Sequence, residues 1–322
     1  MVGAIIQTKI FSYIIPSMKI TLPDGSVRKL EAGANGFDLA NNIGPGLAKA
    51  AIAVSVNGIQ KDLCDPINED SEVSIITIDS DEGLEIMRHT LAAQVLARAV
   101  KNLNPDTKLA IGPTIKDGFY YDFEFAKPIA PDDLDKIEKE MLKIINSKSS
   151  ITKKLHSKKD ALNVFNSIGE SYKESIIDES EQEDNFQLYY KENDEFVDLC
   201  RGPHLPSLKH IGAFKLTKLA GAYWKGDSKN KMLTRIYGTA WKNEKDLNTY
   251  LNSLEEAEKR DHRKIGKEMN LFHFQEEAPG MVFWHPNGWT VYRLLQDFMR
   301  DKLQAFDYQE INTPLVVDRK LW

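Results

Sequence analysis

Three tight-turn signals fix how the first part of this chain can fold. Pro23-Asp24-Gly25, Asn57-Gly58 and Lys116-Asp117-Gly118 each lie between short runs of strand-forming residues. Glycine and asparagine adopt the positive φ angles of hairpin turns at little steric cost. We therefore expect antiparallel strands at all three places, in a chain that also carries helical patterns. The predicted fold class is α+β, distributed over several domains.

The first domain is predicted over residues 18–80. A strand begins at Met18, a last strand covers Val73–Ile78, and helical stretches fall near Phe37–Asn42 and Ala48–Ala53. Strands wrapped around a helix in so short a segment resemble a ubiquitin-like β-grasp. Any other small α+β domain is the alternative, because turn chemistry alone does not separate the two.

Residues 1–17 precede this domain and are somewhat apolar. A signal peptide needs a basic start and an unbroken apolar run, whereas Gln7, Thr8 and Lys9 interrupt this one. We interpret the segment as a disordered extension or a misplaced start, with Met18 as the functional start. No stretch reaches the roughly 20 apolar residues that span a bilayer, so no membrane association is predicted.

The overall composition is that of an ordinary globular protein. Hydrophobic residues make up 42% and charged residues 28% of the 322 residues, a length that suggests two or three domains. The net charge of −6 excludes a polycation, so any nucleic-acid contact must come from a local basic surface. Cys64 and Cys200 form no disulfide framework, and a reducing, cytoplasmic setting fits best.

The middle domain is predicted over residues 83–242 and opens with the clearest helix of the chain. Apolar side chains recur at helical spacing over residues 83–104, and Pro105 ends the pattern. A second helix is expected from Pro131 to about Asn146. A short strand is expected over Phe196–Cys200, just before a Gly-Pro bend.

Two stretches of opposite charge follow. Residues 174–195 hold nine acids and one lysine and are predicted to form a solvated loop and sheet edge, whereas residues 215–242 hold seven basic residues and one acid. Aromatic residues alternate with the basic ones, which favours contact with RNA phosphates and bases. A core of aromatic rings under solvated lysines is the alternative. The predicted RNA contacts are Lys215, Lys218, Tyr223, Trp224, Lys225, Lys229 and Arg235.

The best catalytic cluster comes from three separate segments. It supplies two imidazoles, a cation, a carboxylate and a thiol, from His89, Lys173, Asp198, Cys200 and His204. An imidazole can position or deprotonate water, and a lysine can stabilise the oxyanion formed when water attacks an ester. This set suits hydrolysis of an activated acyl bond. A structural histidine, a buried cysteine, or a weak two-ligand metal pair of Cys200 and His204 are the alternatives.

The C-terminal part is predicted to contain a linker and the start of another domain. Residues 243–268 form a charge-balanced amphipathic pattern, which we interpret as one linker helix. Residues 269–322 begin a new unit, with a helix from about Trp289 to Phe306 and a strand over Tyr308–Val317.

Several strings along the chain resemble threonyl-tRNA synthetases of the bacterial type. They include His89-Thr-Leu-Ala, Gly169-Glu-Ser-Tyr-Lys and Asp198-Leu-Cys-Arg-Gly-Pro-His, followed by Ala220-Gly-Ala-Tyr-Trp-Lys-Gly-Asp-Ser and Gln275-Glu-Glu-Ala-Pro-Gly-Met-Val-Phe-Trp-His. They occur in the order of that family, and the resemblance covers residues 18–322. It implies a TGS domain over 18–80 and an editing domain over 83–242.

The resemblance implies an editing function for the middle domain, which would hydrolyse mischarged seryl-tRNA(Thr). His89, Lys173, Asp198, Cys200 and His204 match the functional positions of the family's editing motif. Serine lacks only one methyl group of threonine, and a methyl group is worth about 1–3 kcal/mol in a binding pocket. A second, hydrolytic site is the expected remedy for such weak discrimination.

One position departs from the family pattern. The family usually has His-x-x-x-His, and the second position here is Ala93. The imidazole pair is lost, which removes one ligand from any metal-binding interpretation and puts editing efficiency in question. No metal site is therefore predicted in this chain.

The resemblance also implies a larger parent enzyme. Residues 269–322 resemble the start of a class II catalytic domain, including motif 1 of the homodimer interface. The parent would use ATP, Mg²⁺ and one Zn²⁺ to charge tRNA(Thr) with threonine, but the residues that bind them are absent from this chain. We expect a fragment that does not aminoacylate alone. The alternatives are a freestanding trans-editing deacylase and a tRNA-binding module without activity.

Overall fold

The computed structural model describes residues 17–191, 196–314, 316 and 318–321. Contacts divide the chain into two compact units, Met1–Asn248 and Thr249–Trp322. The interpretation of residues 1–17 lies outside the described residues, except for Ser17. No helix in the described part of the chain combines the length and the apolar character that a membrane span requires.

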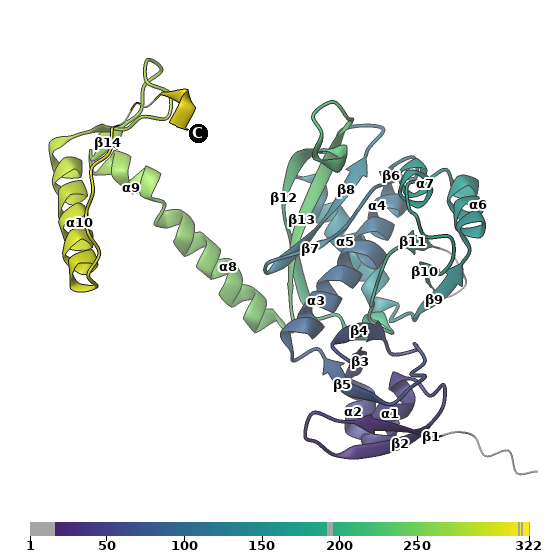
Figure 1. The fold of residues 1–322 in the computed structure, drawn as a ribbon. Coiled ribbons are helices and arrows are strands. Elements are labelled where there is room, and N and C mark those ends of the chain that lie inside the picture. Colours follow the sequence, from purple (N-terminus) through teal and green to yellow (C-terminus); the bar gives the residue numbers. More distant parts are fainter. Residues whose placement is uncertain (1–16, 192–195, 315, 317, 322) are drawn as a thin grey trace, which may run out of the picture. The chain divides into compact units, whose positions relative to one another are not determined.

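The first domain is a five-stranded sheet with two short helices (Figure 1). The strand order is β2-β1-β5-β3-β4, and β1 pairs with β5 in parallel while the other pairs are antiparallel. This arrangement confirms the predicted β-grasp. Its elements are β1 (Ser17–Thr21), β2 (Val27–Glu31), α1 (Gly36–Ile43), α2 (Pro45–Ala50), β3 (Ala51–Val56), β4 (Ile59–Asp62) and β5 (Ser71–Thr77).

The helix predicted over Ala48–Ala53 was placed wrongly. The helix α2 begins at Pro45 and ends at Ala50, and the next three residues belong to β3. Ala51 and Ala53 pair with β5 and are buried. Burial in the sheet outweighs the intrinsic helix preference of alanine.

A long helical stretch opens the middle domain where the sequence predicts it. It consists of α3 (Asp81–Thr90), a π-helical segment (Leu91–Leu96) and α4 (Ala97–Leu103). Ser80 caps the start by accepting a hydrogen bond from Gly83 N–H. All six residues of the π-helical segment are buried. Such segments widen a helix locally and are frequent at functional sites.

This helix packs on an antiparallel sheet with strand order β12-β13-β8-β6. The predicted Lys-Asp-Gly turn joins β7 to β8, and Asp117 has a φ of 60°. The helix predicted from Pro131 begins two residues later. The elements are β6 (Lys108–Leu109), β7 (Thr114–Ile115), β8 (Gly118–Glu124), α5 (Asp133–Asn146), a 3₁₀ turn (Leu208–His210), β12 (Ala213–Tyr223), a 3₁₀ turn (Trp224–Gly226) and β13 (Met232–Trp241).

A second small sheet completes the middle domain, with strand order β11-β10-β9. The helices α6 and α7 lie beside it (Figure 1). Its core is built around the buried side chains of Phe165, Ile177 and Leu188. The elements are β9 (Ile151–His156), α6 (Lys158–Ile168), α7 (Ser171–Asp178), β10 (Phe186–Lys191) and β11 (Val197–Leu199).

The acidic stretch 174–195 is more ordered than predicted. Only residues 179–185 form a connection, because α7 continues to Asp178 and β10 begins at Phe186. Apolar residues inside the stretch, such as Ile177 and Leu188, are fully buried. Counting charges hides these buried positions, which hold the helix and the strand in place. Residues 192–195 lie outside the described residues.

The second unit corrects two further predictions. The linker over 243–268 is two helices, α8 (Glu244–Lys259) and α9 (His262–Glu268), because Asp261 caps the second one through Arg263 N–H. The strand predicted over Tyr308–Val317 is not formed in the described residues 308–314. The remaining elements are β14 (Phe272–His273), β15 (Phe283–Trp284), α10 (Pro286–Ala305) and a 3₁₀ turn (Arg319–Leu321).

Candidate active site

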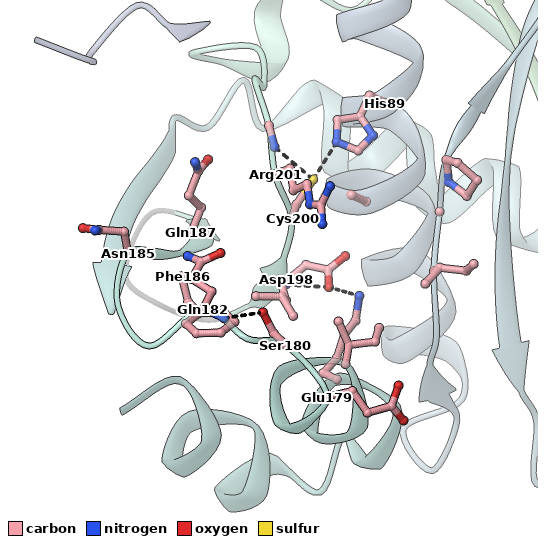
Figure 2. Close-up of a pocket in the computed structure, with 18 residues that line it drawn as sticks. His89, Glu179, Ser180, Gln182, Asn185, Phe186, Gln187, Asp198, Cys200 and Arg201 are labelled. Carbon is pink, nitrogen blue, oxygen red and sulfur yellow. Dashed lines mark hydrogen bonds and ion pairs between the residues drawn. The ribbon is translucent and has the colours of Figure 1, made fainter. Parts of the chain in front are cut away.

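A cavity of about 870 Å³ lies between the long helix and the small sheet of the middle domain. Figure 2 shows side chains from four segments converging on it. Four of the five predicted catalytic residues line its wall: His89, Lys173, Asp198 and Cys200. His204 does not line this cavity and lies behind His89.

The first pair in the cavity joins Lys173 to Asp198. The Lys173 Nζ lies 2.5 Å from Asp198 Oδ1, and both side chains are at most 3% exposed. Asp198 also accepts hydrogen bonds from the Tyr121 hydroxyl at 3.0 Å and from Leu199 N–H at 2.8 Å. A buried carboxylate that accepts from three donors holds the neighbouring Lys173 side chain in one position.

Glu170 fixes the helix α7 that carries Lys173. Glu170 Oε1 pairs with Lys101 Nζ at 2.8 Å, and its Oε2 accepts from Leu109 N–H at 2.7 Å. The Glu170 side chain is 1% exposed. The start of α7 is therefore tied to both the long helix and β6 of the large sheet. Because of this, Lys173 enters the cavity from a rigid element.

The second pair joins His89 to Cys200. The His89 Nε2 lies 2.6 Å from Cys200 Sγ, and Gly202 N–H donates to the same sulfur at 3.3 Å. Burial lowers the pKa of His89 below that of free imidazole, and the opposing effects of Asp198 and a backbone hydrogen bond with Gly112 are smaller. A neutral imidazole at neutral pH can act as a base.

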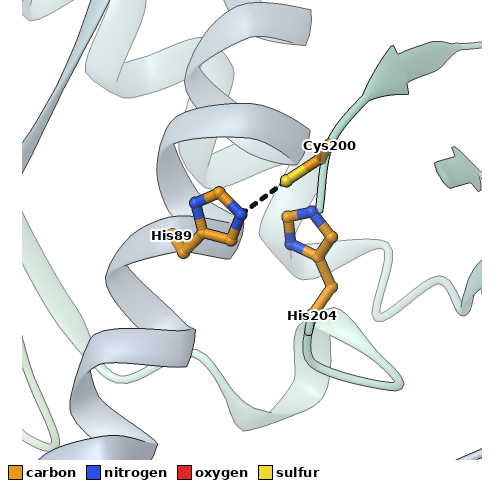
Figure 3. Close-up of side chains that lie close together, drawn as sticks. All are labelled: His89, Cys200 and His204. Carbon is orange, nitrogen blue, oxygen red and sulfur yellow. Dashed lines mark hydrogen bonds between the residues drawn. The ribbon is translucent and has the colours of Figure 1, made fainter. Parts of the chain in front are cut away.

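His204 supports this pair from behind. Its ring stacks on the His89 ring with centroids 4.6 Å apart and an interplanar angle of 8° (Figure 3). Thr90 Oγ1 donates to Ile86 O, accepts from Leu205 N–H, and lies 3.1 Å from His204 Nδ1. The Thr90 hydroxyl thus links the main chain of the long helix to the His204 ring and to the main chain of the next residue. The His204 Nε2 is buried and has no hydrogen-bond partner in the described structure.

These three side chains are also the donors that a metal ion would use. The ligand atoms of His89, Cys200 and His204 lie within 4.8 Å of one another. A tetrahedral zinc ion bound to both His89 and Cys200 would hold nitrogen and sulfur about 3.5 Å apart. The observed 2.6 Å between His89 Nε2 and Cys200 Sγ is shorter than that separation. Ala93 lines the cavity and offers no fourth ligand. The three side chains would therefore supply three protein ligands, the number found in zinc sites that keep a fourth position open.

Three residues of the site were missed by the sequence analysis. Thr90 lies inside a quoted string and Tyr121 follows the predicted Lys-Asp-Gly turn, but neither residue type stands out without the fold. Tyr121 is fully buried, and burial together with Asp198 raises its pKa well above the usual value. Gly112 borders the cavity, where a Cβ atom would come within 2.1 Å of the Tyr121 ring. Only the spatial contacts identify these residues.

The predicted RNA contacts lie on the hairpin β12–β13, outside the cavity. Several are paired with acids: Lys215 with Glu138 at 2.8 Å, Lys225 with Glu179, and Arg235 with Asp122. Lys218 and Lys229 are exposed and pair with no carboxylate among the described residues. Tyr223 is 40% exposed, and Trp224 packs edge-on against Tyr172. The local charge of this hairpin is therefore partly neutralised.

Two family models match the chain within its first unit. Residues 18–77 match the TGS domain, and residues 187–237 match the threonyl and alanyl tRNA synthetase second additional domain. The second match includes β10, β11 and the Cys200–His204 loop. The chain thus combines a TGS domain with an additional domain of the kind found in threonyl and alanyl tRNA synthetases.

Curated relatives identify the particular family. The chain is 53% identical over 303 residues to the threonine–tRNA ligase of Hahella chejuensis, and 52% identical to those of Prochlorococcus marinus and Rhodospirillum rubrum. Each match covers 94% of this chain and 47% of the relative. The chain belongs to the threonine–tRNA ligase family and spans about half the length of the curated relatives it matches.

Proposed function

We propose that the cavity hydrolyses the ester bond of seryl-tRNA(Thr) and so removes serine from mischarged tRNA. The observation that carries this proposal is the convergence of a neutral imidazole, a thiol and a buried ion pair on one cavity, next to the segment that matches the second additional domain. An ester needs a base for water and a positive charge for the oxyanion, and these groups supply both.

The roles follow from the contacts. His89 is held neutral by burial and accepts a proton from the attacking water. Lys173 faces the same cavity and stabilises the oxyanion of the tetrahedral intermediate, while Asp198 holds the ammonium in place. The bond between the acyl carbon and the ribose oxygen then breaks, and the protonated His89 returns its proton to that oxygen as serine leaves. The attacking water takes the place beside His89 Nε2 that Cys200 Sγ holds in this structure.

Selection of serine over threonine rests on size. A hydrolytic pocket that excludes the larger threonine side chain needs no contact that recognises serine uniquely. A hydrolytic site that admits only the smaller product is the second sieve of double-sieve editing. The π-helical segment of the long helix suits such exclusion, because all six of its residues are buried and packed elements yield little to extra volume.

The proposal is tested by incubating the 322-residue chain with seryl-tRNA(Thr), and with threonyl-tRNA(Thr) for comparison. Release of serine above the uncatalysed rate is expected, with a loss of about 10²-fold in His89→Ala. Asp178→Ala, an exposed residue at the end of α7, is the matched control and should keep full activity. Equal rates in the chain and in buffer would refute the proposal.

The activity of the longer enzyme is part of the same proposal. The relatives are named as threonine–tRNA ligases, and we propose that this chain serves a protein that charges tRNA(Thr) with threonine using ATP. The Mg²⁺ and Zn²⁺ ions, the homodimer and the cytoplasmic setting expected from the resemblance remain predictions. A freestanding deacylase would hydrolyse seryl-tRNA(Thr) in a cell that holds a separate complete synthetase. A pure binding module would bind the tRNA without hydrolysing it.

A further inference from the structure

One carboxylate of the first domain reaches the editing-type site. Asp62 is the last residue of β4, and its side chain is 9% exposed. Asp62 Oδ1 accepts a hydrogen bond from His204 N–H at 2.9 Å, although the two residues lie 142 positions apart. Asp62 Oδ2 accepts from the Tyr189 hydroxyl at 2.7 Å and pairs with Lys153 Nζ at 3.0 Å. The β-grasp domain thus touches the Cys200–His204 loop directly.

The loop fits this contact closely. Gly202 has a φ of +65°, and a Cβ atom there would come within 1.9 Å of the Tyr189 hydroxyl and 3.2 Å of Asp62 Oδ2. The Tyr189 ring meets the His204 ring edge-on, with centroids 4.4 Å apart. Asp62 and Tyr189 together form the surface against which the Cys200–His204 loop packs, which we call its seat. Any shift of this seat would move the residues at both ends of the loop.

The two domains also share one apolar core. Ile52, Ala53 and Ile76 of the first domain pack with Met87 and Leu91 of the long helix, and all five are buried. Because packed interiors deform little, the shared core fixes the position of the first domain relative to the long helix. Lys153 of β9 joins the contact through Asp62 and Asp65, whose charges raise its pKa despite burial that lowers it. The seat is therefore held on both sides by charged contacts.

We propose that Asp62 is a positioning residue for the hydrolytic site, acting through His204 on the pair of His89 and Cys200. Asp62 does not line the active cavity, whereas its partner His204 stacks on His89 at 4.6 Å. The hydrogen bond from His204 N–H to Asp62 fixes the position of the Cys200–His204 loop relative to the long helix. It thereby fixes the distance from Cys200 Sγ to His89 Nε2. The inference rests on the proposed hydrolysis and assigns the first domain a part in it.

The test compares Asp62→Ala with two matched variants of the 322-residue chain. Asp65→Ala removes the other carboxylate that pairs with Lys153, and its hydrogen bond from Asp62 N–H, but leaves the Asp62 side chain to accept from His204 N–H. Asp62→Asn keeps an oxygen that can accept from His204 N–H. We expect Asp62→Ala to lower kcat for seryl-tRNA(Thr) hydrolysis by about 10²-fold with little change in KM, since misplacement of this size acts on chemistry. Asp65→Ala should stay near wild type, and Asp62→Asn should recover most of the loss.

A second readout separates this inference from the proposed hydrolysis. In a Cys64→Ser background, the rate of Cys200 alkylation by iodoacetamide is followed against pH. If the loop moves away from His89, the pH at which the alkylation rate reaches half its maximum should change. Asp62→Ala should therefore shift this pH, and Asp65→Ala should not. If the unaltered chain hydrolyses nothing, the proposed function fails while the alkylation profiles still decide the positioning role. Identical profiles for Asp62→Ala and the unaltered chain, or equal losses in Asp62→Ala and Asp65→Ala, would overturn the inference.

Discussion

Thr90 joins the long helix to the loop that carries His204. Its hydroxyl is fully buried and contacts Ile86 O, His204 Nδ1 and Leu205 N–H. The His204 Nε2 is buried and has no hydrogen-bond partner among the described residues. The carboxylate of Asp62 holds the backbone of the same histidine. His204 is thus constrained at its ring and at its main chain.

The Thr90→Val substitution tests this constraint. It leaves the Leu205 N–H group buried without an acceptor and the His204 Nδ1 atom without its hydroxyl partner, which should lower the free energy of unfolding by about 1–3 kcal/mol. Thr90→Ser keeps the hydroxyl and loses only a methyl group, so most of its stability should remain. Urea denaturation of the two variants measures the difference. Equal destabilisation of both would show that the hydroxyl contacts contribute little.

The pH dependence of hydrolysis tests the state of His89. Burial lowers the His89 pKa, and the base is active when it is neutral. The activity should therefore persist as the pH falls through about 6.5, the pKa of free imidazole, and decline only at lower pH. The plot of kcat/KM against pH, corrected for uncatalysed hydrolysis, reports this pKa in the free enzyme. An acid limb centred above 6.5 would contradict the lowered pKa.

At the scale of single residues, the sequence predicted which chemical groups form the site but not which of them line the cavity. His89, Lys173, Asp198 and Cys200 do meet at one cavity, as a shared site requires. His204 lies behind them, and that difference depends on how the Gly-Pro bend folds against Tyr189. The departure at Ala93 was visible in the sequence. Its position on the cavity wall, within the π-helical segment, was not.

At the scale of elements, the hairpin β12–β13 carries the basic residues predicted to contact RNA. Lys225 and Arg235 are engaged with Glu179 and Asp122, so their charges serve the fold at least in part. Lys218 lies over the Tyr237 ring with Nζ 4.7 Å from its centroid, and Lys229 follows at the hairpin tip. These two lysines are the ones most available to phosphates.

The Lys218→Ala/Lys229→Ala double variant tests the role of this hairpin. If both lysines contact phosphates, the slope of log K against log salt for tRNA(Thr) should fall by about 1.5 in magnitude. The matched control is Lys136→Ala/Lys143→Ala on α5, where both side chains are exposed and paired with acids. Filter binding at several salt concentrations gives the slopes. Equal slopes for the two double variants would remove the hairpin from the interface.

Elements with a strong local signal were predicted, and elements set by distant contacts were not. Hairpin turns such as Asn57-Gly58 and the helix over 83–104 carry their own signals in sequence. The helix α2 ends at Ala50 because the following residues, in β3, pair with β5. The predicted linker helix is interrupted at Asp261 because this residue caps the start of α9. The acidic stretch was assigned to a loop because charge outweighed its few buried apolar residues.

At the scale of the whole molecule, the second unit leaves much apolar surface uncovered. On α10, Leu294 is 64%, Leu295 60% and Phe298 55% exposed. Apolar patches of this kind promote association. We expect the 322-residue chain to scatter more light at equal concentration than a version ending at Arg263. A triple variant should also scatter less light than the unaltered full chain; it carries Leu294→Gln, Leu295→Gln and Phe298→Gln. Equal scattering by all three proteins would contradict this expectation.

The domain plan predicted from the sequence can be compared with the whole structure. The β-grasp and the editing-type domain were recognised from their strings and turns, and the family matches cover parts of both. The sequence did not indicate that the two share a core and that Asp62 crosses between them. The bond between Asp62 and His204 joins residues 142 positions apart, and no local pattern encodes such a contact.

The central claim is that the cavity at His89 and Lys173 selectively hydrolyses seryl-tRNA(Thr). The most direct measurement is the ratio of single-turnover rate constants for seryl-tRNA(Thr) and threonyl-tRNA(Thr), with the 322-residue chain in excess. The account predicts a ratio of at least about tenfold in favour of serine, lost in His89→Ala. A ratio near one, or hydrolysis that survives His89→Ala unchanged, would contradict it.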